Sequence, residues 1–142
     1  MTKRKVEVLF LCVSNSCRSQ IAEGWARHLG ARVLEPYSAG QKATLVQPNA
    51  IRVMKEKGID IGGQWSKTID KVPVHELDCI VTLCAEGAEF CPTVPGPAQR
   101  LHWGIDDPVS VKGSDDEVMA AFRKARDEIE SRMKEFLRSL PA

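Results

Sequence analysis

The sequence predicts an α/β fold, a three-layer α/β/α arrangement around a four-stranded parallel sheet. Two observations lead to this prediction. Apolar runs such as VEVLFL and CIVTL alternate along the chain with segments of helical periodicity, and within these runs apolar and polar residues do not alternate. Continuous apolar strands of this kind are typical of parallel sheets that are covered on both faces.

The individual elements are predicted from the apolar pattern and from signals at their ends. Strands are expected at residues 6–11, 32–37, 79–83 and 101–103. Helices are expected at residues 18–29, 48–57 and 74–77, and a long last helix is expected from Ser114 onward. Ser114 and Glu117 have the spacing of a capping box. With 142 residues, of which 43% are apolar, the chain is expected to form one domain over residues 1–142.

The composition argues against several classes of partner. A net charge of +1 gives no field that would favour nucleic acid, and no apolar run approaches the roughly 18 to 20 residues that span a bilayer. The start of the chain is interpreted as a strand and not as a secretion signal, so a cytoplasmic location is expected. The five cysteines are odd in number and contain no CxxC pair, so neither a disulfide framework nor a structural metal site is expected. No cofactor is expected either.

Chemically reactive side chains follow three of the predicted strands. Cys12 follows the first strand, Cys84 follows the third, and an Asp-Asp-Pro run at residues 106–108 follows the fourth. In open parallel sheets, binding sites lie at the carboxyl ends of the strands. These three segments are therefore expected to meet at one edge of the sheet.

The segment CVSNSCR, residues 12–18 and called the anion loop below, joins the first strand to the first helix. Backbone N–H groups and the positive end of a helix dipole attract an anion, and Arg18 can bind two of its oxygens with a planar guanidinium. We expect a tetrahedral oxyanion here, and the same field should favour the thiolate of Cys12, with help from the Ser19 hydroxyl. The residues expected around the oxyanion are Val13, Ser14, Asn15, Ser16, Cys17 and Arg18. The alternative is a buried cysteine at a strand end followed by a surface arginine.

Four segments together resemble a known family: FLCVSNSCRSQIAEGWAR, YSAG, VTLCAEGAEFCP and HWGIDDP. They resemble the low-molecular-weight protein tyrosine phosphatase fold and, more closely, the thioredoxin-coupled arsenate reductases built on that fold. The resemblance covers nearly the whole chain. It implies that Cys12 is the nucleophile, that Arg18 holds the oxyanion and that Asp107 is the general acid. It also implies that Cys84 and Cys91 are the thiols that resolve the adduct.

Alternatives stay open for some of these residues. Asp107 could instead cap a turn or a helix, and Cys84 and Cys91 could be ordinary buried cysteines. The remaining cysteines, Cys17 and Cys79, are expected to have no essential chemical role.

Two activities fit the resemblance. A reductase would convert arsenate to arsenite through a Cys12 adduct and a redox-active Cys84–Cys91 disulfide that thioredoxin reduces, as part of arsenical resistance and detoxification. A phosphatase would hydrolyse phosphomonoesters through a Cys12 phosphoenzyme and would need only that cysteine. The reductase is favoured because two further cysteines are present and because DDPVSVKGSDD holds no aromatic residue for a phosphotyrosine ring. A non-enzymatic oxyanion-binding or redox-signalling module is a third hypothesis, but it would not need an acid at Asp107.

In many relatives a potassium ion lies behind the anion loop. Asn15, Glu23 and Ser38 match residues of that site, whereas Lys67 stands where relatives carry an acidic residue. We expect the Lys67 ammonium to take the place of the cation and to pair with Glu23. The alternative is that Lys67 simply points into water.

Overall fold

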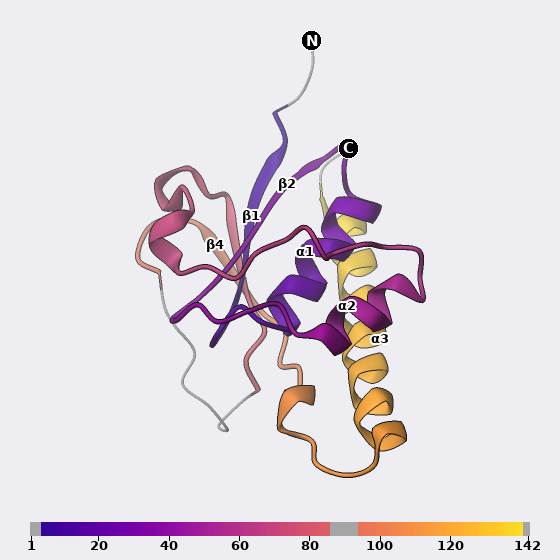
Figure 1. The fold of residues 1–142 in the computed structure, drawn as a ribbon. Coiled ribbons are helices and arrows are strands. Elements are labelled where there is room, and N and C mark those ends of the chain that lie inside the picture. Colours follow the sequence, from indigo (N-terminus) through magenta and orange to yellow (C-terminus); the bar gives the residue numbers. More distant parts are fainter. Residues whose placement is uncertain (1–3, 86–93, 141–142) are drawn as a thin grey trace.

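The computed structural model describes residues 4–85 and 94–140, and the predicted fold class is confirmed. Its sheet contains the strands β1 (Val6–Cys12), β2 (Leu34–Gly40), β3 (Cys79–Thr82) and β4 (Gln99–His102). All neighbouring strands are parallel, and their order across the sheet is β2-β1-β3-β4. The carboxyl ends of all four strands therefore lie at the same edge of the sheet (Figure 1).

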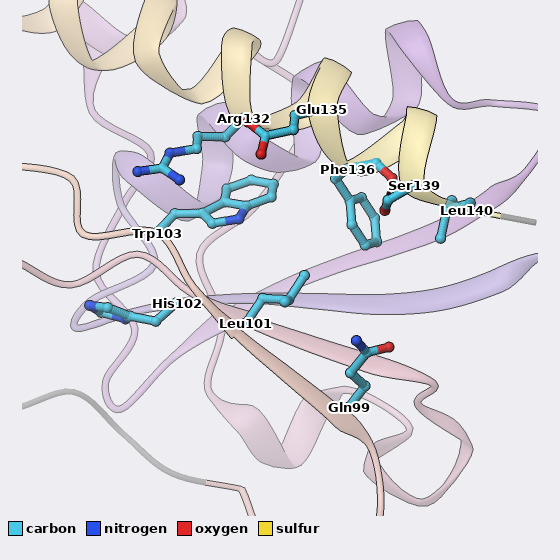
Figure 2. Close-up of a pocket in the computed structure, with 9 residues that line it drawn as sticks. All are labelled: Gln99, Leu101, His102, Trp103, Arg132, Glu135, Phe136, Ser139 and Leu140. Atoms are coloured by element: carbon cyan, nitrogen blue, oxygen red, sulfur yellow. Dashed lines mark hydrogen bonds between the residues drawn. The ribbon is translucent and has the colours of Figure 1, made fainter.

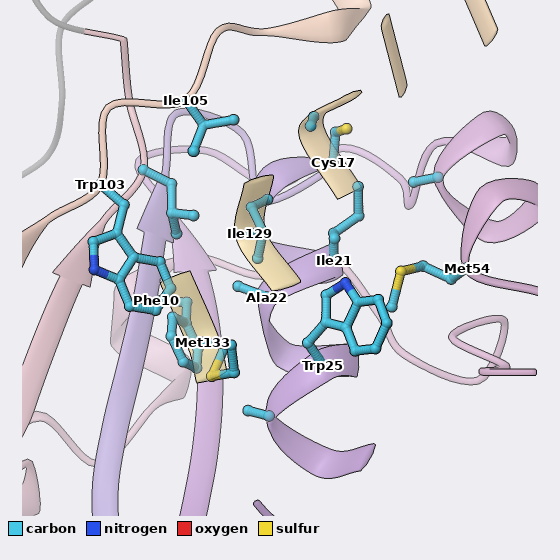
Figure 3. Close-up of a cluster of buried hydrophobic side chains, with 14 of the residues drawn as sticks. Phe10, Cys17, Ile21, Ala22, Trp25, Met54, Trp103, Ile105, Ile129 and Met133 are labelled. Carbon is cyan, nitrogen blue, oxygen red and sulfur yellow. The ribbon is translucent and has the colours of Figure 1, made fainter. Parts of the chain in front are cut away.

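The α-helices of the described chain pack together on one face of the sheet. They are α1 (Arg18–Leu29), α2 (Pro48–Lys55) and α3 (Asp115–Ser139), and Figure 1 shows all three on the same side of the strands. Apolar side chains from the helices and from one face of β1 and β3 form the larger core cluster (Figure 3). Trp103 contacts Phe10 of β1 and Phe136 of α3 there, with ring centroids 5.9 and 6.2 Å apart. The first pair is tilted and the second is edge-to-face.

The opposite face of the sheet is covered by short 3₁₀ helices and loops in the described chain. The helices η1 (Ile69–Lys71) and η2 (Val74–Glu76) lie there, and a smaller apolar cluster fills the space beneath them. That cluster contains Leu9, Leu11, Ala39, Val72, Leu77, Ile80 and Val94. The helix predicted at residues 74–77 is η2, so the layer on this face is thinner than the layer of α-helices.

The element bounds differ from the prediction at a few ends. β2 extends beyond the predicted end at residue 37 because Ser38, Ala39 and Gly40 pair with the last residues of β1. α2 ends at Lys55, and the following turn contains Gly58 with a φ of 76°, which favours glycine. The capping box predicted for Ser114 and Glu117 is present at the start of α3. Among the helices that the structure describes, none is long and apolar enough to cross a membrane.

A charged cluster joins α3 to the end of α2. Arg126 is buried, and its Nη1 donates to Val53 O at 2.9 Å and to Glu56 Oε1 at 2.7 Å. Arg123 donates to Glu56 Oε2 at 2.8 Å. Hydrogen bonds from Arg123 and Arg126 lower the pKa of Glu56 from 4.5 to about 2.

This cluster predicts a pH-dependent contribution to stability. Because the pKa of Glu56 is lower in the folded chain, its contribution is complete above pH 4.5 and is lost as the pH falls toward 2. The difference in unfolding temperature between the wild type and Glu56→Gln should therefore shrink over that interval. Thermal unfolding followed by circular dichroism measures it, and a difference that stays constant from pH 5 to pH 2 would contradict the prediction.

Candidate active site

The anion loop lies between the end of β1 and the start of α1. Cys12 is the last residue of β1, Arg18 is the first residue of α1, and Asp107 is the N-cap of η3 (Pro108–Ser110) beyond β4. The structure brings these three residues to one pocket of about 310 Å³. Its walls are Cys12, Val13, Ser14, Ser16, Cys17, Arg18, Lys42, Thr44, Leu45, Gln47, Asp107 and Val109. Asn15 is fully buried behind this pocket.

A second and larger pocket, of about 520 Å³, lies between β4 and the last turns of α3 (Figure 2). Trp103 and Phe136 form its floor, and Arg132 and Glu135 stand at its margin. None of the predicted site residues lines it. The smaller pocket at the anion loop is the one that combines a thiol, an arginine and a carboxylate.

Asn15 sets the shape of the anion loop. Its φ of 49° makes it the only non-glycine residue with a positive φ in the described chain. Asn15 Oδ1 accepts from the backbone N–H of Lys67 at 2.9 Å, and Asn15 Nδ2 donates to Ser19 Oγ at 2.7 Å. The backbone N–H of Lys67 can only donate, so it fixes which end of the Asn15 amide is oxygen.

Ser19 transmits this arrangement to Cys12. Ser19 Oγ lies 2.8 Å from Cys12 Sγ. Because this hydroxyl already accepts a hydrogen bond from Asn15, its own hydrogen is available for the sulfur. A hydrogen bond donated to sulfur stabilises the thiolate, which is the reactive form of cysteine. Buried Cys12 thus has the partner expected of a nucleophile.

Arg18 is held at the ends of two strands. Its side chain is buried, and Nη1 donates to the backbone oxygens of Ile105 at 3.0 Å and Leu83 at 3.3 Å. The carbonyl groups that follow β3 and β4 thereby orient the guanidinium at the pocket wall. A fixed, planar guanidinium binds an oxyanion with little loss of side-chain freedom.

Asp107 uses its two carboxylate oxygens differently. Oδ1 accepts from the backbone N–H of Val109 at 3.0 Å and caps η3. Oδ2 lies 3.8 Å from Arg18 Nη2. The side chain is 31% exposed, so a proton can reach it from solvent. One carboxylate oxygen of Asp107 therefore caps η3, and the other lies beside Arg18.

The other cysteines of the described chain have contrasting environments. Cys17 packs into the main core beside Ile21 (Figure 3). Burial raises the pKa of its thiol far above the usual value, and the charge of Cys12 raises it further. Burial likewise raises the pKa of Cys79 to about 11. Both thiols are free and stay protonated at neutral pH, which makes them poor nucleophiles.

Cys84 follows β3 and is buried. It is disulfide-bonded, whereas Cys12 is a free thiol. Leu83, the residue before it, donates its N–H to Leu11 O at 2.8 Å, so the chain at Cys84 leaves the sheet beside the end of β1. Cys91, the second predicted resolving thiol, lies outside the described residues.

Lys67 lies inside the molecule, behind the anion loop. Its side chain is 9% exposed, and Nζ is 3.9 Å from Glu23 Oε1. The ammonium also donates to Trp65 O at 3.0 Å. Glu23 accepts from Ser38 Oγ at 2.5 Å and from Arg27 at 2.9 Å. Lys67 therefore does not point into water.

The residues around Lys67 do not fit a potassium ion. The ammonium already contacts Glu23 and Trp65 O, the kind of oxygen ligands that a cation would need. The positive charge of the ammonium would also repel a potassium ion bound to the same oxygens. Burial lowers the pKa of Lys67, while the Glu23 carboxylate acts in the opposite direction.

The comparison with known families agrees with this geometry. Residues 7–142 match the sequence pattern of the low molecular weight phosphotyrosine protein phosphatase family. The chain belongs to this family. Within the family, the chain is 48% identical over 132 residues to an arsenate reductase of Halalkalibacterium halodurans, covering 93% of this chain and 95% of that protein. It is 47% identical over 129 residues to an arsenate reductase of Bacillus subtilis, with 91% and 93% covered.

Solved structures of family members show the same fold. An arsenate reductase in the phosphate-binding state superposes with a TM-score of 0.78 at 33% identity, and covers 96% of this chain and 99% of that one. A thioredoxin-dependent arsenate reductase of Corynebacterium glutamicum superposes with a TM-score of 0.73 at 25% identity. That match covers 98% of this chain and 63% of the Corynebacterium chain.

Gly40 is a site residue that the sequence interpretation missed. It pairs with Cys12 at the ends of β1 and β2, and the anion loop passes directly over it. A Cβ at Gly40 would lie 2.7 Å from both Asn15 N and Val13 O, which is shorter than a van der Waals contact. The signal in the sequence is the glycine at the end of YSAG, at the edge of the sheet that holds the site.

We predict that Gly40→Ala displaces the anion loop. The new methyl group meets backbone atoms, so the loop must move. The free energy of unfolding should therefore fall by about 1–3 kcal/mol. Binding of inorganic phosphate, measured by isothermal titration calorimetry, should weaken. Gly63→Ala is the matched control because a Cβ there meets nothing within 4 Å. Equal phosphate affinity in the two variants would contradict the prediction.

A second prediction concerns Lys67. Because its ammonium already occupies the position behind the anion loop, the unfolding temperature should be the same in potassium and sodium chloride at equal ionic strength. Lys67→Asp exchanges the ammonium for a carboxylate and should make the unfolding temperature higher in potassium. A potassium-specific rise in the wild type would show that a cation site coexists with Lys67.

Proposed function

We propose that this protein reduces arsenate to arsenite through a Cys12 adduct and a Cys84–Cys91 disulfide that thioredoxin recycles. The observation that carries the proposal is the free Cys12 thiol at the anion loop, hydrogen-bonded to Ser19 and facing Asp107 across one pocket. The identity to curated arsenate reductases over nearly the full chain supports the same reaction.

The first step joins arsenate to the enzyme. The Cys12 thiolate attacks arsenic, an As–S bond forms and one As–O bond breaks. Asp107 supplies a proton to the departing oxygen, which leaves as water. Arg18 and the N–H groups of the anion loop hold the remaining oxygens and stabilise their negative charge.

The second step transfers two electrons. The Cys84 thiolate attacks the sulfur of Cys12, and the electrons of the As–S bond pass to arsenic, which leaves as arsenite. Cys91 then attacks Cys84, which releases the Cys12 thiolate and leaves a Cys84–Cys91 disulfide. A disulfide-bonded Cys84 beside a free Cys12 is the combination expected once this exchange is complete.

Thioredoxin is the proposed reductant, and the cytoplasm is the proposed location. The Corynebacterium glutamicum neighbour is thioredoxin-dependent, and the cycle needs a compartment where dithiols are kept reduced. Phosphatase activity is the weaker alternative. Among the described residues that line the pocket, Leu45 and Val109 stand at the rim and none is aromatic, so nothing there can stack on a phosphotyrosine ring.

The decisive experiment is arsenate turnover with thioredoxin, thioredoxin reductase and NADPH. The rate of NADPH oxidation should depend on arsenate, and it should drop sharply when glutaredoxin and glutathione replace thioredoxin. Cys12→Ser is nearly isosteric and should abolish turnover while the fold is kept. Hydrolysis of a phosphomonoester without arsenate turnover would instead establish the phosphatase.

We predict that Asp107→Asn slows formation of the adduct by roughly 10² to 10⁴, the usual contribution of a general acid. The amide keeps the acceptor that caps η3 but has no acidic proton to give. Exchange between the Cys84–Cys91 disulfide and thioredoxin should stay nearly unchanged. Rapid-quench measurement of the first turnover separates the two steps, and equal losses in both would point to a structural role.

The relay predicts different stalled forms for the two resolving cysteines. Cys91→Ser should release one equivalent of arsenite and then stop as a Cys12–Cys84 disulfide. Cys84→Ser should stop earlier, with no arsenite released. Peptide mapping after one equivalent of arsenate identifies each form. Sustained turnover of Cys91→Ser with thioredoxin would rule out the relay.

A further inference from the structure

A fully buried glutamine, Gln20, lies directly behind the anion loop. Its Nε2 donates to Asn15 O at 3.0 Å, to Asn15 Oδ1 at 2.9 Å and to Trp65 O at 3.0 Å. We propose that Gln20 is a positioning residue that holds Asn15 in its left-handed conformation and thereby keeps the Cys12 thiolate and the oxyanion cradle in place.

The orientation of the Gln20 amide is unambiguous. Two of the acceptors, Asn15 O and Trp65 O, are backbone carbonyls, which can only accept. On the other side, Gln64 Nε2 donates to Gln20 Oε1 at 2.8 Å. A flipped amide would place oxygen against carbonyl oxygens and NH₂ against NH₂, so the hydrogen-bond network fixes which end donates.

The conformation of Asn15 requires such support. A non-glycine residue with a φ of 49° persists only where surrounding contacts hold it. Gln20 binds both the backbone carbonyl and the side-chain oxygen of Asn15, so it couples the backbone turn to the orientation of the side chain. That orientation aims Asn15 Nδ2 at Ser19, and Ser19 contacts the Cys12 sulfur.

Gln20 also ties the anion loop to the segment at residues 64–67. Besides Trp65, this segment supplies Ser66, whose Oγ donates to Ser14 O at 2.9 Å, and Lys67, whose N–H donates to Asn15 Oδ1. The segment therefore forms a support behind the loop. Gln20 is the buried side chain of α1 that hydrogen-bonds to both the loop and this support.

The test compares Gln20→Met with Gln64→Met. Methionine keeps the length of the side chain but removes the donor, so Asn15 should lose its support in the first variant. The second variant removes a partner of Gln20 but leaves its Nε2 contacts intact. The readouts are iodoacetamide alkylation of Cys12 at pH 7, followed by peptide mass spectrometry, and the affinity of inorganic phosphate measured by protection against alkylation.

We expect Gln20→Met to lower both the alkylation rate and the phosphate affinity by roughly tenfold or more, the effect of about 1.4 kcal/mol. Gln64→Met should change the alkylation rate and the phosphate affinity by less than about threefold. This should hold even if the unfolding temperature of Gln64→Met falls as much as that of Gln20→Met. Equal effects of the two variants, or no effect of Gln20→Met, would overturn the proposal. A purely structural role would lower the unfolding temperature of both without separating their reactivity.

A measurement on the wild type keeps the proposal testable if Gln20→Met does not fold. The side-chain amide protons of Gln20 should exchange slowly with solvent in ¹⁵N spectra, and saturating phosphate should slow them further. Those of Gln64 should not respond to phosphate. Fast exchange at Gln20, or no response to phosphate, would overturn the role of Gln20.

The inference rests on the proposed role of the anion loop, but its readouts do not require arsenate turnover. A wild type that binds phosphate and is alkylated at Cys12 but does not reduce arsenate would refute the proposed function alone. Unchanged phosphate affinity and alkylation in folded Gln20→Met would refute the positioning role alone.

Discussion

The left-handed backbone at Asn15 is the constraint on which the rest of the site depends. It turns the chain between β1 and α1 so tightly that the loop lies against Gly40, where no Cβ can be accommodated. It also directs one end of the Asn15 amide to Ser19 and the other to Lys67. The shape of the anion loop and the contact of Ser19 with Cys12 thus depend on one strained residue, which buried hydrogen bonds hold in place.

The sheet determines how the reactive groups meet. β1, β3 and β4 are consecutive in the parallel sheet. Cys12 is the last residue of β1, and Cys84 and Asp107 lie in the segments that follow β3 and β4. Arg18 connects these strand ends by donating to the carbonyls of Leu83 and Ile105. Cys12, Arg18 and Asp107 therefore line one pocket at the carboxyl edge of the sheet, and Cys84 follows the neighbouring strand β3.

The free thiols of the described chain are all buried and differ in the partner of the sulfur atom. Burial opposes a charge on the sulfur of Cys17 and of Cys79 and raises the pKa of both thiols. Cys12 is equally hidden but has the Ser19 hydroxyl as a hydrogen-bond partner. Behind the loop, Lys67 supplies an internal positive charge beside Glu23, so this chain carries its own cation.

The sequence by itself determined the order of strands and helices, the strand-to-helix position of the anion loop and the capping box of α3, because periodicity and local hydrogen bonds encode them. It also pointed to Cys12, Arg18 and Asp107 through their places after predicted strands and at the start of a helix. Tertiary structure alone decided the contacts of Gln20 and Gly40 behind the anion loop, the contact of Asp107 with Arg18 and the thin layer over the second face of the sheet. Gln20 meets Trp65 across 45 positions and Asn15 meets Lys67 across 52. No local pattern records contacts between segments so far apart, because they exist only once the chain has folded.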